Sequence, residues 1–383
     1  MTHHRPHPAS PLLDHCPPTL PAEAYSDPAW FARERAAIWA REWVCAGRLD
    51  DFAPGTQRAL DLAGAPVLLC RHADGSVSAF HNTCRHRGSE LCAAGAPRPL
   101  GRLIACPYHA WAYEARTGRL VSTAFATPAA DFRRADHGLR PVAHRLWNGF
   151  LFLSLAADPG PLEPDAGLAA LDNWPMETLV AGHSVTRDLA CNWKVFWENY
   201  NECLHCPGIH PGLCEMVPQY GRGIMSQPEE PGWTPADPPR PNLRPGALTW
   251  TPDGQPCGPV FPGLTAAERA AGHTFVTLYP TMYIVAHVDH VRFVTLAPDG
   301  PLRTRLTATW LFPPETLAQP GFDAAHVAAF ATRVIDEDGA AAEMNQRGLA
   351  SPGYGRGTLM PQEYDIARFH RWVMARLEER APA

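Results

Sequence analysis

The sequence predicts an α+β protein with two folded parts: a small all-β domain, followed by a domain in which helices flank an antiparallel sheet. Three observations support this fold class. Short β segments separated by turn residues fill the stretch from Trp43 to about Phe152. A helical period of buried residues begins after Asn192. Three strand-like runs and two further helical segments lie nearer the C-terminus.

The first 44 residues are predicted to lie outside the β domain. Residues 1–22 are rich in Pro and His and show no periodicity, so we expect a mobile tail. Asp27 and Pro28 are typical of an N-cap and a first-turn proline, and apolar residues recur from Trp30 to Trp43. We therefore predict an N-terminal helix within residues 23–44 that packs on the second domain.

The all-β domain is expected to span residues 45–155. The Pro-, Gly- and acid-rich stretch LAADPGPLEPDAG, which follows Phe152, marks its end. Turn residues at 73–75 and 117–118 separate the β segments within it. We expect strands at Arg58–Leu62, Pro66–Arg71, Val77–His81, Leu103–Ala105 and Leu120–Ser122.

The second domain, residues 156–383, is predicted to combine a buried helix with an antiparallel sheet. The stretch from Trp193 to Cys206 contains no Gly or Pro, so we expect one helix that Pro207 and Gly208 stop. Residues 210–272 lack a steady period, which is typical of long functional loops over a pocket. We expect strands at Phe275–Ala286, Val291–Leu296 and Leu302–Leu311, and helices at Asp323–Gln346 and Pro361–Glu379.

Composition excludes several classes of protein. The 383 residues are 45% hydrophobic, which supports sizeable cores. A net charge of −6 argues against a nucleic-acid binder or an anionic-membrane binder, because both need clustered basic charge. The longest apolar run, from Leu146 to Ala157, is too short to span a bilayer, and the N-terminus lacks an apolar signal core. We therefore predict a cytoplasmic protein.

Eleven cysteines in a chain of this length do not indicate a disulfide framework, and a reducing cytoplasm is the simpler setting. Some of the thiols are therefore candidate metal ligands. Cys203 and Cys206 form the pair CLHC, which a motif search would assign to a redox or zinc site. We expect neither, because the pair lies in the predicted helix and no strand–helix unit of the redox type surrounds it.

The stretch NWKVFWENYNECLHCPGIHP contains a first set of metal-ligand candidates. Glu202 and His205 are three residues apart, which places them on one face of a helix, and His210 follows from the loop beyond. Two neutral imidazoles suit iron, zinc or copper, and a carboxylate from elsewhere would complete a site with open positions. The alternative is that these are ordinary histidines at a helix end.

A second set lies upstream, within the β domain. Cys84 and His86 form Cys-x-His, and Cys106 and His109 form Cys-x-x-His; each pair follows a strand-like run. Two loops of this kind can clasp one centre. Two thiolates and two imidazoles favour either zinc or a two-iron cluster with cysteines on one iron and histidines on the other.

The segments CRHRG and CPYHAW together resemble the Rieske [2Fe–2S] motif. With ENYNECLHCPGIH downstream, the chain from about Asp27 onward resembles the catalytic subunit of a Rieske non-haem iron oxygenase. The resemblance implies a Rieske domain and a catalytic domain of the helix-grip (START-like) kind. It also implies that Cys84 and Cys106 hold one iron of the cluster, and His86 and His109 the other.

The same resemblance assigns a mononuclear Fe(II) to His205, His210 and a carboxylate from the later helix. In VIDEDGAAAEMNQRGLAS, Asp338 matches the family's ligand, with Asp336 and Glu337 as neighbouring alternatives. Glu202 is implied to bridge His205 to His109 of a neighbouring subunit in a homotrimer, and Asn199 is a further catalytic candidate. O2 would be the cosubstrate, and NAD(P)H would supply electrons through a separate flavin- or ferredoxin-type reductase.

The segments around the metal ligands also resemble the branch of this family that hydroxylates or N-demethylates quaternary ammonium compounds such as choline, glycine betaine, carnitine or proline betaine. Aromatic faces bind such cations. The candidate aromatic residues are Phe196, Trp197, Tyr200, Tyr279, Tyr283 and Phe293.

Three other functions compete with this interpretation. One is hydroxylation or O-demethylation of an aromatic or alicyclic acid, which would want an apolar pocket with one Arg or Asn. The second is an electron-transfer protein without mononuclear iron. The third is a zinc-stabilised binding module.

Overall fold

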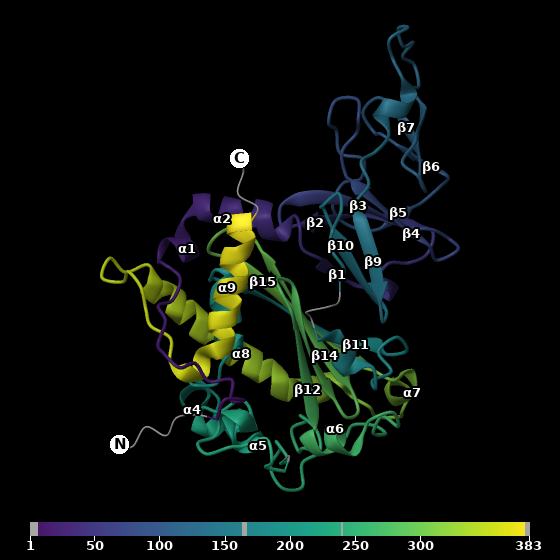
Figure 1. The fold of residues 1–383 in the computed structure, drawn as a ribbon. Coiled ribbons are helices and arrows are strands. Elements are labelled where there is room, and N and C mark those ends of the chain that lie inside the picture. The colour runs from purple at the N-terminus through teal and green to yellow at the C-terminus, as the bar shows by residue number, and fades with distance from the viewer. Residues whose placement is uncertain (1–6, 163–166, 239, 380–383) are drawn as a thin grey trace. The chain divides into compact units, whose positions relative to one another are not determined.

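The structure, a computed structural model, describes residues 7–162, 167–238 and 240–379. The chain divides into two compact units, each described here by itself: Trp39–Leu162 forms one, and Met1–Ile38 with Glu163–Ala383 forms the other. Figure 1 follows the chain through both.

The unit Trp39–Leu162 consists of three antiparallel sheets. All five predicted strands occur in it, so the all-β prediction is confirmed. The sequence missed the others because several are too short to show alternation, and Phe150–Ser154 is buried at every position. The sheets are β1-β10-β9, β4-β3-β2-β5 and β6-β7-β8. Their strands are β1 Val44–Arg48, β2 Thr56–Leu62, β3 Ala65–Arg71, β4 Val77–His81, β5 Arg98–Pro99, β6 Leu103–Ala105, β7 Ala112–Glu114, β8 Leu120–Ser122, β9 Ala143–Trp147 and β10 Phe150–Ser154.

The other unit contains a five-stranded antiparallel sheet in the order β11-β15-β14-β13-β12, with helices beside it (Figure 1). Helix α3 packs against β14 and against α8 and α9, so it lies between the sheet and the two long C-terminal helices. The strands are β11 Val180–Leu189, β12 His273–Leu278, β13 Met282–His287, β14 Val291–Pro298 and β15 Thr304–Phe312. The helices are α1 Glu23–Ser26, α2 Pro28–Glu34, α3 Trp193–Tyr200, α4 Cys206–Ile209, α5 Pro211–Met216, α6 Ala266–Ala271, α7 Pro314–Leu317, α8 Ala324–Leu349 and α9 Tyr364–Glu379.

One prediction about this sheet is wrong, and one of its strands was not predicted. The run Phe275–Ala286 is not one strand but parts of β12 and β13, because Pro280 has no N–H to continue a ladder and the chain reverses between Leu278 and Met282. Strand β11 was missed, because its mostly part-exposed, polar residues do not show an apolar alternation. None of the helices in the described residues is long and apolar enough to cross a membrane.

The long C-terminal helices agree with prediction. Helix α8 begins after Asp323, whose side chain accepts hydrogen bonds from the backbone N–H groups of Ala325 and His326. Helix α9 follows a short 3₁₀ turn at Pro361–Glu363. The α+β fold class is therefore confirmed.

The N-terminal segment is held in place where the structure describes it. The backbone N–H of Thr19 donates to Gly357, that of Leu359 donates to Pro17, and the side chain of Leu20 is buried. The expected mobile tail is therefore wrong for residues 13–22, because backbone hydrogen bonds tie them to residues 355–361; residues 1–6 lie outside the described part.

A buried ion pair joins the N-terminal helix α2 to α3. The Nζ atom of Lys194 lies 2.6 Å from Oε1 of Glu34, and both side chains are fully buried. The indoles of Trp193 and Trp30 donate to the same carboxylate at 2.9 and 3.0 Å. A buried charge is tolerated when it is paired and hydrogen-bonded, so this cluster fixes α2 on the helix that leads into the candidate site.

Candidate metal centres

The segment that carries the first ligand candidates is not one helix, which corrects the prediction for Trp193–Cys206. Asn192 caps α3 by accepting a hydrogen bond from the N–H of Lys194 at 3.0 Å, and the helix ends at Tyr200. Glu202 and His205 lie in the turn that follows. Pro207 stands in the first turn of α4, where its fixed φ suits a helix start, so it begins a helix rather than ending one.

Cys203 and Cys206 form a disulfide that encloses Leu204 and His205. We expected neither a redox nor a zinc site at this pair, and the bond between its two sulfur atoms was not predicted. The two Cα atoms are 5.0 Å apart, within the range that a disulfide spans, so the bond needs only the close spacing of the pair and no surrounding strand–helix unit.

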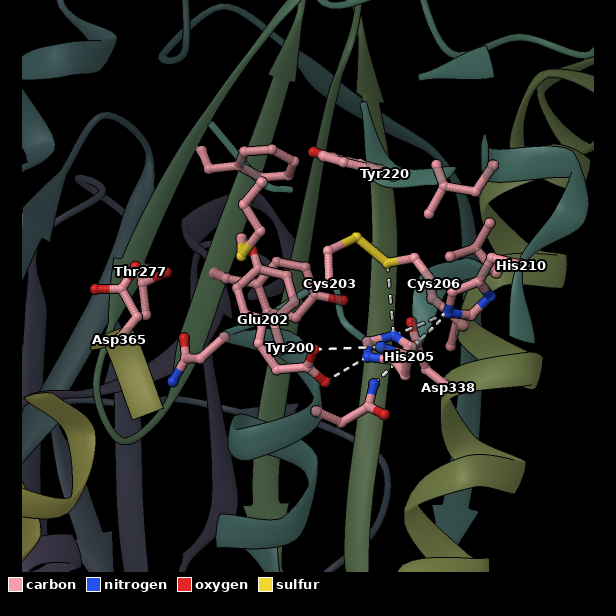
Figure 2. Close-up of a pocket in the computed structure, with 18 of the residues that line it drawn as sticks. Tyr200, Glu202, Cys203, His205, Cys206, His210, Tyr220, Thr277, Asp338 and Asp365 are labelled. Carbon is pink, nitrogen blue, oxygen red and sulfur yellow. Dashed lines mark hydrogen bonds and ion pairs between the residues drawn. A yellow bond between two sulfur atoms is a disulfide. The ribbon is translucent and has the colours of Figure 1, made fainter. Parts of the chain in front are cut away.

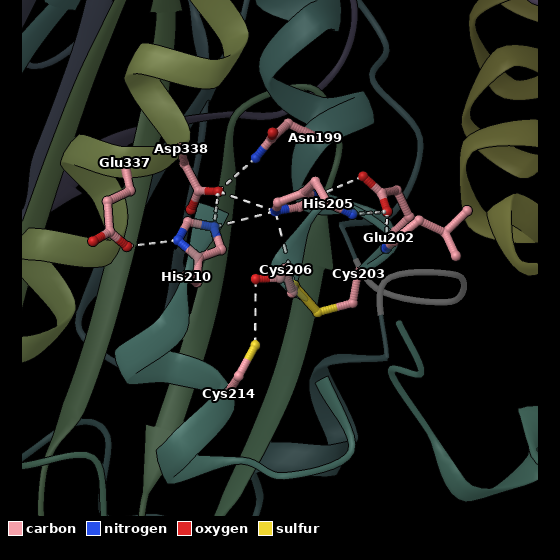
Figure 3. Close-up of polar contacts among 10 residues, drawn as sticks. Asn199, Glu202, Cys203, His205, Cys206, His210, Cys214, Glu337 and Asp338 are labelled. Carbon is pink, nitrogen blue, oxygen red and sulfur yellow. Dashed lines mark hydrogen bonds and ion pairs between the residues drawn. A yellow bond between two sulfur atoms is a disulfide. The ribbon is translucent and has the colours of Figure 1, made fainter. Parts of the chain in front are cut away.

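Three donor atoms from different segments converge beside this turn (Figure 3). The Nε2 atoms of His205 and His210 are 3.2 Å apart, and Oδ1 of Asp338 lies 3.4 Å from the first and 2.9 Å from the second. Ligands about 2.1 Å from one first-row metal ion lie roughly 3.0–3.4 Å apart at octahedral or tetrahedral angles. The donor set therefore fits one metal ion held by two imidazoles and one carboxylate.

Glutamates hold the far nitrogen of each imidazole. Nδ1 of His205 lies 2.5 Å from Oε1 of Glu202, and Nδ1 of His210 lies 2.7 Å from Oε2 of Glu337. With Nδ1–H donated to a carboxylate, each Nε2 is left with its lone pair toward the centre. The other oxygen of Glu202 accepts the backbone N–H of Leu204. The turn therefore also orients Glu202.

The charges at this centre shift one another's pKa values. Burial alone would lower the pKa of His205, but the carboxylates of Asp338 and Glu202 outweigh it and raise that pKa to about 9. Burial would raise the pKa of Asp338, but hydrogen bonds from His205 and His210 lower it to about 2. In His210 burial is again outweighed by carboxylates, and the pKa is raised. The metal-free centre thus holds protons that a metal ion would displace.

The three consecutive acids of α8 point in different directions, because neighbouring residues of a helix are about 100° apart. Asp336 pairs with the exposed Arg187 at 2.7 Å. Glu337 reaches His210, and Asp338 faces both histidines and accepts a 2.6 Å hydrogen bond from Asn199. The geometry therefore separates Asp338 from the two alternatives. Glu337 was not predicted as an orienting group, and in the sequence only its place beside Asp338 signals it.

The second set of candidates lies on two similar loops of the β unit. Cys84 follows β4 and Cys106 follows β6, and both thiols are buried. The carbonyl of each cysteine accepts the N–H of the residue four positions later, Gly88 or Ala110, and each of those residues has a positive φ. The two loops therefore close in the same way and present their cysteines toward each other.

Hydrogen bonds surround the sulfur atoms of these loops. The hydroxyl of Tyr113 lies 3.1 Å from Sγ of Cys84. Burial raises the pKa of Cys84; for Cys106 burial is outweighed by the N–H groups of Tyr108 and His109, and the pKa is lowered. The rings of His86 and His109 have centroids 4.8 Å apart. Two thiols and two imidazoles on facing loops fit a [2Fe–2S] cluster.

A third group of potential ligands, Cys257, Asp289 and His290, has a structural explanation. The carboxylate of Asp289 accepts hydrogen bonds from the hydroxyl of Thr249, the backbone N–H of Cys257 and Nδ1 of His290, at 2.7, 2.7 and 2.9 Å. These bonds tie the 249–257 loop to the turn between β13 and β14. We therefore assign this group a structural role and do not count it as a metal site.

A cavity of about 260 Å³ opens beside the converging ligands (Figure 2). Of the predicted aromatic residues, Tyr200 and Tyr283 line it. The others do not: the indole of Trp197 donates to the carbonyl of Pro280, the hydroxyl of Tyr279 accepts from Asn201, and Phe293 faces the opposite side of the sheet. Residues that the sequence did not predict also line the cavity: Tyr220, Trp250, Phe275, Thr277, Arg292 and Asp365.

Comparisons with known proteins agree with this arrangement. The family model described as the ring hydroxylating alpha subunit (catalytic domain) matches residues 176–379, and that of the Rieske [2Fe-2S] domain matches residues 42–133. The glycine betaine monooxygenase oxygenase subunit of Chromohalobacter salexigens is 31% identical, over 95% of this chain and 88% of the relative. The chain belongs to the Rieske oxygenase alpha subunits. The resemblance recognised in the sequence is therefore confirmed.

Other Rieske oxygenases are similar over different parts of the chain. The carnitine monooxygenase oxygenase subunit of Escherichia coli is 31% identical over 52% of this chain and 54% of the relative. A quaternary ammonium Rieske monooxygenase solved with L-carnitine superposes with a TM-score of 0.69 at 20% identity, covering 94% of this chain and 95% of that one. A naphthalene 1,2-dioxygenase from Rhodococcus superposes with a TM-score of 0.59 at 17% identity, covering 95% of each chain. Both superpositions establish the shared fold.

Membership of the Rieske oxygenase alpha subunits defines the cofactors. The chain uses a Rieske [2Fe–2S] cluster, a mononuclear iron, O2 and electrons supplied by a reductase. The two donor sets described above fit these two metal centres.

Proposed function

We propose that this Rieske oxygenase subunit hydroxylates or N-demethylates a small quaternary ammonium compound. The observation that carries the proposal is the cavity itself: its aromatic walls, including Tyr200 and Tyr283, lead directly to His205, His210 and Asp338. Aromatic faces attract a quaternary ammonium group through their π electrons. The rings of Tyr200 and Tyr283 stack with centroids 3.9 Å apart, so they form one continuous wall.

The same proposal assigns ligands to both metals. His205, His210 and Asp338 hold the mononuclear iron, which when bound supplies the activation of O2, while Cys84, Cys106, His86 and His109 hold the cluster. Glu202 and Glu337 fix the tautomer and direction of the two imidazoles, and Asn199 positions the Asp338 carboxylate. The cavity walls hold the substrate and exclude water. A hydroxylated N-methyl group then releases formaldehyde without further help from the protein.

Electron delivery is the second part of the proposal. Glu202, His205 and Asn199 also line a separate hollow of about 350 Å³. We assign this hollow to the approach of the partner subunit's His109 in a homotrimer, with Glu202 bridging the two histidines. A flavin- or ferredoxin-type reductase would deliver electrons from NAD(P)H to the cluster. We place this system in the cytoplasm, where NAD(P)H is available.

A single-turnover experiment tests the substrate class. The protein loaded with both metals is reduced anaerobically, and O2 is admitted with glycine betaine, carnitine, choline or an aromatic acid. We expect a quaternary ammonium compound to accelerate cluster reoxidation and to yield its hydroxylated or demethylated product. If only aromatic acids accelerate cluster reoxidation, the competing function holds instead: hydroxylation or O-demethylation of an acid. The presence of Arg292 in the cavity is an observation that favours this competing function. Chain that binds a cluster but no mononuclear iron would instead be an electron-transfer protein, and colourless protein would indicate a zinc module.

A further inference from the structure

Arg292 is a buried cation in the wall of the catalytic cavity. It stands on β14, opposite Val285 of β13, which in turn pairs with Phe275 of β12. Paired residues of an antiparallel sheet share a face, so Arg292 faces the same side as Phe275 and, by alternation, Tyr283. All three line the cavity, whereas the neighbouring Phe293 faces the other side.

The guanidinium of Arg292 has no anionic partner among the described residues. Its side chain is 4% exposed, and neither Nε nor Nη1 has a hydrogen-bond acceptor within the described part of the chain. Its Cζ atom lies 5.9 Å from the centroid of the Trp250 ring. Burying an unpaired charge is costly, so such a side chain in a binding cavity points to a ligand that completes the pair.

Two further hydrogen-bond donors of the cavity wall are also buried without an acceptor in the described part of the chain. The hydroxyl of Tyr200 and the indole N–H of Trp250 are buried and have no partner among the described residues. Arg292 acts electrostatically on Tyr200, Tyr220 and Tyr283, since it opposes the rise that burial causes in the pKa of each hydroxyl. Donors from three separate segments therefore line one part of the cavity, and no carboxylate in the described part of the chain is paired with them.

A carboxylate matches this arrangement. It is planar, carries four lone-pair positions, and pairs with a guanidinium through two parallel hydrogen bonds. A neutral hydroxyl would leave most of these donors unpaired and would not balance the charge. The aromatic wall formed by Tyr200 and Tyr283 remains available for a cationic group nearer the metal ligands.

We propose that Arg292, with Tyr200 and Trp250, binds the carboxylate of a zwitterionic betaine and turns its quaternary ammonium group toward His205, His210 and Asp338. The inference rests on the proposed function and narrows it to carboxylated quaternary ammonium compounds. Choline, which carries an alcohol where a betaine carries its carboxylate, would be a poor ligand.

Binding of matched ligands to the holoprotein tests the proposal. Glycine betaine, choline and 3,3-dimethylbutanoate share a bulky trimethyl head; the second lacks the carboxylate, and the third lacks the positive charge. Dissociation constants are measured anaerobically by calorimetry for the wild type, Arg292→Met, Arg292→Lys and the control Arg305→Met. Arg305 lies on neighbouring β15, where it is exposed and paired with Asp188.

We expect the wild type to bind glycine betaine at least tenfold more tightly than choline. Arg292→Met should raise the dissociation constant of glycine betaine roughly 10- to 100-fold, as expected for loss of a charge-assisted pair. It should change the dissociation constant of choline by less than threefold. Arg292→Lys should restore part of the difference because it keeps the charge. Arg305→Met should bind all three ligands like the wild type. Cluster absorbance and thermal unfolding show whether each variant is folded.

Two outcomes would overturn the inference in different ways. If the wild type binds choline as tightly as glycine betaine, or if Arg292→Met weakens both equally, the carboxylate anchor fails and the proposed function stands. If the wild type binds 3,3-dimethylbutanoate or benzoate but no quaternary ammonium compound, the inference of a zwitterionic ligand and the proposed function are both wrong. The wild-type comparison needs no variant, so it decides even if Arg292→Met does not fold.

Discussion

Removing the charge of Glu34 should destabilise the catalytic unit strongly, although Glu34 is not part of either metal centre. Its carboxylate is the anionic partner of Lys194, and both side chains are fully buried. Breaking a buried ion pair by removing one partner costs about 3–5 kcal/mol. Glutamine keeps one acceptor oxygen, which can serve only one of the two indoles of Trp30 and Trp193, so we expect a loss of at least about 3 kcal/mol for Glu34→Gln. For a unit of this size that corresponds to a fall in Tm of about 6–12 °C.

The loss of unfolding free energy in Glu34→Gln should also depend on pH. Burial lowers the pKa of Lys194, and the carboxylate of Glu34 opposes that shift. Without Glu34 the folded protein holds the Lys194 proton less tightly than the unfolded chain, in which the pKa is about 10.4. Stability then rises with pH wherever the unfolded chain binds more protons. The deficit of Glu34→Gln should therefore be largest near neutral pH and shrink toward pH 10.

Thermal and urea unfolding followed by circular dichroism measure these effects. Glu23→Gln is the matched control, because Glu23 is an exposed carboxylate in the same N-terminal segment and should change stability by less than about 0.5 kcal/mol. The double variant Glu34→Leu, Lys194→Met should recover much of the loss, since it leaves no charge buried. A Glu34→Gln protein that melts within 2 °C of the wild type would refute the reasoning.

Three further predictions concern the mononuclear site. Asp338→Asn should lose most of its mononuclear iron while Asp336→Asn keeps it, measured as iron per cluster; equal iron in both would exclude Asp338 as a ligand. The pKa of His205 is raised to about 9 in the metal-free chain, and a ligand imidazole must be neutral, so metal binding should release protons and tighten as pH rises toward 9. Calorimetry in buffers of different ionisation enthalpy measures the protons released. A value of zero would contradict the prediction. The unfolded, cluster-free chain should titrate nine thiols before reduction and all eleven afterwards, because Cys203 and Cys206 are joined; eleven without reductant would argue against the bond.

Local signals in the sequence predicted much of the architecture, the two cysteine–histidine pairs, and His205 and His210 as candidate ligands, whereas Asp338 was assigned by the family resemblance. The cysteine and histidine pairs are set by short loops that follow strands, and the start of α8 is set by the cap at Asp323, so nearby residues were sufficient. The turn after Tyr200 and the disulfide within it were not predictable in the same way. No Gly or Pro interrupts Trp193–Cys206, and the end of α3 depends on tertiary contacts that a local pattern does not contain.

The cavity wall illustrates a second limit. Arg292 and Phe293 are adjacent in β14, and successive residues of a strand face opposite sides of the sheet. Both faces of β14 are largely buried, so its sequence has no polar alternation that would identify the side toward the cavity. We predicted the aromatic residue, and the structure places its charged neighbour in the wall instead.

The elements that hold the proposed iron ligands differ from those that form much of the cavity wall. His205 lies in a turn, His210 lies between α4 and α5, and Asp338 lies in α8. The wall residues Phe275, Thr277, Tyr283 and Arg292 come from strands of the sheet. A substitution on a strand can therefore alter which molecule fits without moving a ligand atom. In evolutionary terms, the chemistry and the choice of substrate can drift separately, and β12, β13 and β14 are the place to redesign selectivity while the reaction itself is kept.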